Sequence, residues 1–173
     1  MWNYDLVLPN CVIICTFLAF YFMQPRLPIK INKAFVIILL LDFITIISDV
    51  TSTHCLEYFS HLPPFFLRVQ NVIYFILFVQ RIICFFMFTI AIVGKPSRKS
   101  IGSIVLDLFP FIVLNIIIFL NLFTNTIFCI SNSGEYSQGP LHFMIYVCAF
   151  YYVSLSIIYT FVYRKQINKK YLF

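Results

Sequence analysis

Apolar residues fill five long stretches of the chain, and polar residues gather in the short segments between them. The five stretches cover about residues 6–23, 34–53, 71–93, 104–123 and 141–163. Each is close to the roughly 20 residues that an α-helix needs to cross a bilayer. The pattern predicts an all-α integral membrane protein, in which residues 1–173 form one transmembrane domain, a bundle of five helices.

Charge adds an orientation to this bundle. Ten of the twelve Lys and Arg residues lie in three clusters, at residues 26–33, 95–99 and 164–170, and each cluster follows an apolar stretch. Because basic loops stay in the cytoplasm, the clusters predict an N-terminus outside and a C-terminus in the cytoplasm. The same distribution explains the net charge of +6 without a nucleic-acid partner; the expected surrounding is the lipid bilayer.

The second stretch combines a membrane-spanning length with two carboxylates. Asp42 and Asp49 are seven residues apart, so they fall on nearly the same helix face. The same face also carries Thr45, Ser48 and Ser52. A charged side chain at the centre of a span costs about 3 kcal/mol. We therefore expect this polar stripe to point into the bundle and to find partners there.

Arg81 supplies the opposite charge on the next stretch. Its depth falls between those of Asp42 and Asp49, and consecutive antiparallel helices usually pack together. We predict an intramembrane polar network in which Arg81 pairs with Asp49, with Asp42 or with both. Further polar groups lie close to the same face of the third helix: Asn71, Tyr74 and Thr89.

Three interpretations of this network stay open. It holds the two helices in register, or it is a bistable element that a stimulus rearranges to move the fifth helix, or it forms a proton-coupled transport path. The last interpretation lacks the inverted repeat and interrupted helices that are typical of transporters.

Two further expectations concern segments that border the spans. The Pro63-Pro64 pair is expected to prevent a regular helix before residue 71, with Phe65 and Phe66 lying in the interface. Asp107 is expected about one turn from the cytoplasmic interface, where a carboxylate stabilises a helix N-terminus.

Polar side chains at the outer boundary are candidates for contacts with a signal: His54, His61, Glu135, Tyr136 and His142. Histidines titrate near neutral pH and bind metals, but no pair has the spacing HxxxH or HExxH, so we expect no metal site. The motif GEYSQGP predicts a turn that places Pro140 at a helix start. Cys55 and Cys129 fall in outer loops, where a disulfide is an alternative to two free thiols.

Sequence motifs of catalysis do not occur in the chain. There is no GxSxG, Walker loop, HExxH, GxGD or DxDG motif. The two intramembrane acids lie on one helix, whereas an aspartyl dyad needs carboxylates that face each other from two elements. We expect this chain not to be an enzyme and to hold no cofactor.

Three segments carry a family resemblance: LPIKINKAFVIILLLDFITIISDVTST, QNVIYFILFVQRIICFFMF and GEYSQGPLHFMIYVCAFYY. With the basic exit that follows, they resemble the N-terminal multi-helix membrane module of diguanylate cyclases and cyclic-di-GMP phosphodiesterases from clostridial-type bacteria. They are more loosely similar to the seven-helix sensor region of some histidine kinases. The resemblance implies a bacterial cytoplasmic (inner) membrane protein and implicates Asp49, Arg81 and the turn Gly139-Pro140.

Proteins of that family continue into a cytoplasmic output domain with a GGDEF or EAL signature, and neither signature occurs here. The leading hypothesis is therefore a sensory or regulatory module without its own output domain, either a truncated product or a regulator that acts through a homodimer or a separate output protein. The alternatives are a small transporter or channel subunit, in which Asp49→Asn would abolish flux, and a membrane immunity or assembly factor.

Overall fold

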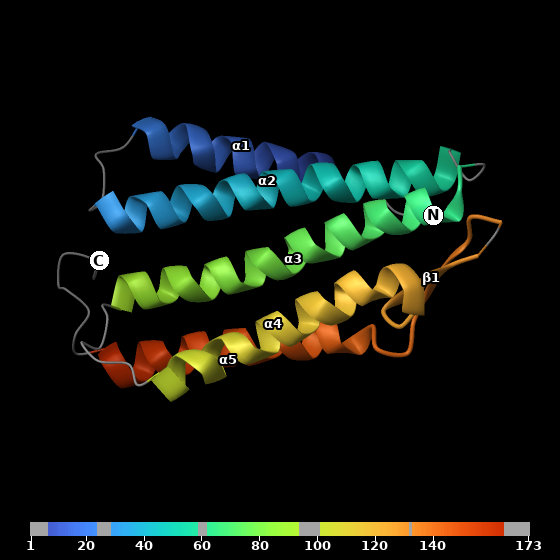
Figure 1. The fold of residues 1–173 in the computed structure, drawn as a ribbon. Helices are drawn as coiled ribbons and strands as arrows, with labels where there is room; N and C mark the ends of the chain where they lie inside the picture. Colours follow the sequence, from blue (N-terminus) through green and yellow to red (C-terminus); the bar gives the residue numbers. More distant parts are fainter. Residues whose placement is uncertain (1–6, 24–28, 59–61, 94–100, 132, 165–173) are drawn as a thin grey trace.

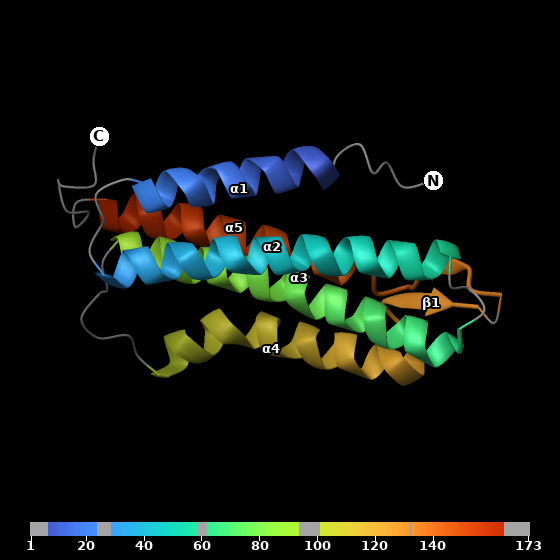
Figure 2. The same ribbon diagram turned by 90° about the horizontal axis from the view of Figure 1, so that it is seen from above.

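The computed structural model describes residues 7–23, 29–58, 62–93, 101–131 and 133–164. Within them it has five helices and a two-stranded hairpin, which run in the order α1 (Val7–Met23), α2 (Ile29–Tyr58), α3 (Pro64–Val93), α4 (Ile101–Thr124), β1 (Phe128–Ile130), β2 (Tyr136–Gln138) and α5 (Phe143–Tyr163). The helices lie side by side along one long axis, and the hairpin sits at one end of the bundle, here called the hairpin end (Figure 1, Figure 2).

Four of the described helices are long and apolar enough to cross a membrane: Asn32–Tyr58, Pro64–Val93, Val105–Thr124 and Phe143–Tyr163. Helix α1 is shorter, at 17 residues. Such a helix is about 25 Å long, whereas the hydrocarbon core of a bilayer is about 30 Å thick. The predicted class, an all-α multi-pass membrane protein, is thus confirmed, with four helices of spanning length and one shorter apolar helix.

Helices α2 and α3 are longer than the apolar stretches that predict them. Helix α2 continues to Tyr58, so Cys55 is helical and does not lie in a loop. Helix α3 begins at Pro64, and the expectation that the Pro63-Pro64 pair prevents a regular helix is wrong. Proline is accepted in the first turn because an N–H there has no helical partner. Phe65 and Phe66 are accordingly exposed residues of α3.

Helix α3 is the centre of the bundle. It packs against α2, α4, α5 and β1, whereas α2 and α5 barely touch each other. Its side chains Leu67, Val79 and Phe86 are almost completely buried. Helix α1 packs on α2, where the ring centroids of Tyr21 and Phe35 are 5.2 Å apart. This arrangement leaves α2 and α5 as two walls with α3 between them.

A proline in α4 explains one contact between α4 and α5. Pro110 has no N–H, so the carbonyl of Leu106, four residues earlier, loses its helical donor. The Tyr151 hydroxyl of α5 donates to that carbonyl at 3.3 Å. In a lipid environment a freed carbonyl must find a partner inside the protein, and the tyrosine supplies it.

Tyr151→Phe should therefore lower the free energy of unfolding by about 0.5–1 kcal/mol. Pro110→Ala restores the missing helical N–H, so in that background the same tyrosine change should cost almost nothing. Reversible unfolding of the four variants in mixed micelles measures both costs. If the cost is the same in both backgrounds, Tyr151 does not serve the carbonyl that proline leaves free.

Candidate functional site

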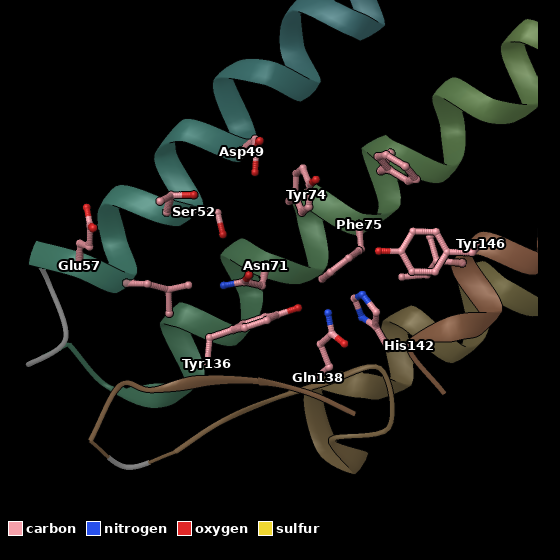
Figure 3. Close-up of a pocket in the computed structure, with 14 residues that line it drawn as sticks. Asp49, Ser52, Glu57, Asn71, Tyr74, Phe75, Tyr136, Gln138, His142 and Tyr146 are labelled. Atoms are coloured by element: carbon pink, nitrogen blue, oxygen red, sulfur yellow. The ribbon is translucent and has the colours of Figure 1, made fainter. Parts of the chain in front are cut away.

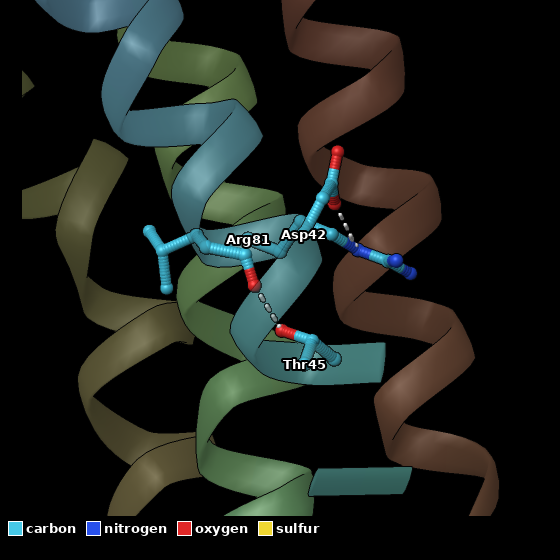
Figure 4. Close-up of polar contacts among 4 residues, drawn as sticks. Asp42, Thr45 and Arg81 are labelled. Carbon is cyan, nitrogen blue, oxygen red and sulfur yellow. Dashed lines mark hydrogen bonds and ion pairs between the residues drawn. The ribbon is translucent and has the colours of Figure 1, made fainter. Parts of the chain in front are cut away.

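An ion pair joins α2 to α3 in the middle of the bundle. Nε of Arg81 lies 3.4 Å from Oδ1 of Asp42, and the two side chains are 36% and 25% exposed (Figure 4). The guanidinium carbon of Arg81 also lies 4.8 Å from the centre of the Phe78 ring. Thr45 takes no part in the pair, since its hydroxyl donates to the Leu41 carbonyl at 2.7 Å. Arg81 therefore contacts the carboxylate of Asp42 on α2 and the aromatic ring of Phe78 on its own helix, α3.

Asp49 belongs to a different level of the bundle. Helices α2 and α3 are antiparallel, and Asp42 lies level with Arg81. Asp49, seven residues after Asp42, therefore lies level with Tyr74, seven residues before Arg81. Asp49 interacts electrostatically with both Arg81 and Tyr74. Among the described residues it makes no hydrogen bond and no ion pair. The three residues of the predicted network are thus found in two places. Asp42 and Arg81 form an ion pair, and Asp49 lies closer to the hairpin end.

A pocket of about 420 Å³ opens at that level, between α2, α3, the hairpin and the start of α5 (Figure 3). This volume is typical of small-molecule sites. The polar and aromatic side chains of its lining include Asp49, Asn71, Tyr74, Tyr136, His142 and Tyr146. Tyr136 reaches across the pocket from the hairpin toward Gln138 and His142 (Figure 3).

The rest of the polar stripe on α2 is buried. Thr45, Ser48 and Ser52 are each less than 8% exposed, in agreement with the prediction that this face does not contact lipid. Ser52 also lines the pocket, level with Asn71 of α3. The stripe therefore forms the α2 side of both the ion pair and the pocket.

The hairpin that closes the pocket is attached to α4 by one buried side chain. Oδ1 of Asn121 accepts hydrogen bonds from the N–H groups of Ile127 and Phe128 at 2.6 and 3.3 Å, and its Nδ2 donates to the Phe128 carbonyl at 3.0 Å. Gly139 allows the return strand to approach closely, because a Cβ there would collide with the Thr126 carbonyl. The motif GEYSQGP thus contains strand β2, and helix α5 begins only at Phe143.

Two pocket residues have defined hydrogen-bonding roles. Nδ1 of His142 lies 3.2 Å from the Ile127 carbonyl oxygen. Since a carbonyl only accepts, Nδ1 donates this hydrogen bond, and in the neutral form of the ring Nε2 is then an acceptor. Nδ2 of Asn71 donates to the Leu67 carbonyl at 2.9 Å, which leaves Oδ1 as an acceptor.

Tyr136 stays a neutral phenol. Burial, and to a smaller extent the neighbouring Tyr146, raises the pKa of Tyr136 to about 12. Its hydroxyl is therefore protonated at neutral pH and keeps a proton to donate.

Other predicted site residues lie elsewhere. His54 is in α2, where its ring centroid is 4.5 Å from that of Tyr58, and it does not line the pocket. Glu135 is exposed on the hairpin loop, and His61 lies outside the described residues. Thr89 donates to the Phe85 carbonyl at 3.1 Å and takes no part in the ion pair.

The thiols and Asp107 also differ from expectation. Cys55 and Cys129 are free thiols, so the disulfide alternative is wrong. Asp107 lies beyond the first turn of α4, which begins at Ile101 and has no acidic residue there. Its carboxylate accepts a hydrogen bond from the Tyr159 hydroxyl at 3.4 Å, so its role is a contact with α5. Within the described ranges, no group of three His, Cys, Asp or Glu residues is placed to hold a metal ion.

Several pocket residues were not predicted. Phe78 is one of them, although the sequence contains a signal for it: Asn71, Tyr74, Phe78 and Arg81 are spaced by three or four residues and share one face of α3. Tyr146 lies one turn after His142, with ring centroids 5.7 Å apart. No sequence pattern indicates that Gln138 lines the pocket, because its position depends on the register of the hairpin strands.

The chain matches no protein-family model, no curated protein and no solved structure. The chemistry of its own residues is therefore the guide to its function.

Arg81→Ala should destabilise the protein more than Asp42→Asn does. Removal of the arginine leaves two carboxylates inside the bundle, whereas removal of Asp42 leaves Arg81 within electrostatic reach of Asp49. We expect a loss of about 1–3 kcal/mol for Arg81→Ala, below the range for fully buried pairs because this pair is partly exposed.

Thermal unfolding and expression level measure the effect of both changes. Lys33→Ala is the control, because it removes one positive charge from an exposed position. Equal and negligible effects of Arg81→Ala and Asp42→Asn would show that the pair does not stabilise the bundle.

Asn121→Leu should loosen the hairpin. The change preserves size but leaves the N–H groups of Ile127 and Phe128 without their side-chain acceptor, at a cost of about 2–4 kcal/mol. Asn115→Leu is the matched control, since the amide of Asn115 donates within α4 itself, to the Phe111 carbonyl at 2.8 Å. Amide hydrogen exchange over residues 126–142 should accelerate in the first variant alone; unchanged protection there would contradict the anchoring role.

Proposed function

We propose that this chain is a sensory module of the bacterial cytoplasmic membrane. In this proposal the pocket receives a small molecule at the outer face, and the Asp42–Arg81 pair responds to it. All five helices, α1 included, cross the membrane, with the hairpin end outside and the opposite end in the cytoplasm. The basic clusters of the sequence favour this orientation, and Lys33 and Arg164 mark the cytoplasmic ends of α2 and α5.

One observation carries the proposal. Phe78 lines the pocket and also lies under the guanidinium of Arg81. A molecule that enters the pocket and displaces this ring changes the surroundings of the arginine directly. The contact therefore provides a short physical path from the pocket to the ion pair.

The geometry around Arg81 also favours a two-state response. A second cavity, of about 330 Å³, lies beside the pair and is lined by residues of α2, α3 and α5, among them Asp42, Arg81, Ala149 and Tyr152. Two carboxylates are alternative ion-pair partners of Arg81: Asp42, at 3.4 Å, and Asp49, which lies farther toward the pocket. Discrete alternative partners of one charged group are a common basis of switching.

The output of such a module is a change in the position of α5 relative to α2. Since the two helices both pack on α3 and barely touch each other, they can move apart without breaking a shared core. The output would reach a second copy of the chain or a separate output protein. The connection with cyclic-di-GMP signalling has its support in the sequence resemblance alone.

Spin labels test this mechanism. Ile37 on α2 and Ile157 on α5 are each 51% exposed, so both accept a label in a background without the six native cysteines. Thr53→Trp fills the pocket in place of a ligand, and we expect it to shift the distance between the labels by about 1–2 Å. Pulsed electron paramagnetic resonance in nanodiscs measures the shift.

The matched control is Thr51→Trp, which adds the same ring on the same helix outside the pocket. Phe78→Ala in the Thr53→Trp chain should abolish the shift, because it removes the link to Arg81. Identical distance distributions for Thr53→Trp and Thr51→Trp would refute the proposed coupling.

A further inference from the structure

We infer that the ligand of this pocket is a small organic cation, an amine with an apolar body, whose ammonium group lies against Asp49. The inference rests on the proposed function in one respect, that the pocket binds a ligand. It adds the chemical class of that ligand and the residue that recognises its charge.

The first argument is the balance of charge. Asp42 and Asp49 face one guanidinium, that of Arg81, and the guanidinium is paired with Asp42. Asp49 lines the pocket without a hydrogen bond or ion pair to any described residue, and the pocket lining contains no Lys or Arg. A cation in the pocket supplies the charge that this carboxylate lacks, whereas an anion would meet repulsion.

The second argument is the aromatic wall. Tyr74, Phe75, Phe78, Tyr136 and Tyr146 all line the pocket, and aromatic faces attract ammonium and guanidinium groups. The structure contains one such contact already, since Arg81 lies 4.8 Å from the centre of the Phe78 ring. A second cation on the pocket side would find the same kind of surface.

The third argument is the supply of acceptors. Oδ1 of Asn71 is left as an acceptor by the hydrogen bond that Nδ2 donates, and Nε2 of His142 is an acceptor in the neutral form of the ring. An ammonium group has only donors to offer, so it complements both atoms and the carboxylate. The hydroxyl groups of the lining can both donate and accept hydrogen bonds, so they do not discriminate between a cationic and an anionic ligand.

Asp49 is a better site for the ammonium group than Glu57, the other acid of the lining. Glu57 is exposed near the end of α2, whereas Asp49 is partly buried beside Tyr74 (Figure 3). The attraction between opposite charges is stronger away from water.

Binding of three matched probes to the full chain in nanodiscs tests the inference. The probes are 2-phenylethylamine, which is a cation at pH 7, 2-phenylethanol, which is neutral, and 3-phenylpropionate, which is an anion. Calorimetric titration should detect the amine alone, after subtraction of its partition into empty nanodiscs. Asp49→Asn should weaken amine binding at least tenfold, while Glu135→Gln, which removes a carboxylate outside the pocket, should leave it unchanged.

A second variant covers the case in which Asp49→Asn fails to fold. Tyr146 is 62% exposed, so Tyr146→Leu should preserve the fold and weaken amine binding several-fold through loss of the aromatic face. Equal binding of amine and alcohol, or equal losses in Asp49→Asn and Glu135→Gln, would overturn the cation site. Failure of the amine to bind would also overturn the cation site. The sensory proposal is tested separately, by the distance shift in Thr53→Trp.

Discussion

The structure depends on one constraint, which is that a charge or a free carbonyl inside a membrane must find its partner within the protein. Arg81 meets Asp42 across α2 and α3 for this reason, and Tyr151 serves the carbonyl that Pro110 leaves without a donor. Both contacts join neighbouring helices. These polar contacts therefore add links between helices to the apolar packing of the core.

Helix α3 connects the pocket with the ion pair. One face of it carries Asn71, Tyr74, Phe78 and Arg81, so a single rigid element contributes to the pocket and to the ion pair. The walls on either side, α2 and α5, contact this helix rather than each other. A change in side-chain packing on α3 therefore reaches two helices that barely touch each other.

The apolar stretches predicted the helices, since a span of about 20 residues is a strong signal, and the spacing of Asp42 and Arg81 predicted that they would meet. Because the depth of Arg81 lay between those of the two acids, either acid was a possible partner, and the register of α2 against α3 selects Asp42. The hairpin was missed because each strand has only three residues, Phe128–Ile130 and Tyr136–Gln138, too few for a visible alternation. Its place depends on Asn121, which lies in an apolar stretch and gives no local sign of its role.

The attachment of the hairpin through Asn121 has an evolutionary consequence. The segment that closes the pocket contributes Tyr136, Gln138 and His142 to its lining, and none of these residues lines the cavity beside the Asp42–Arg81 pair. Substitutions in this short segment can change the shape and polarity of the pocket while the apolar helices keep their sequence. The lining of the pocket and the charged centre of the bundle can therefore evolve at different paces.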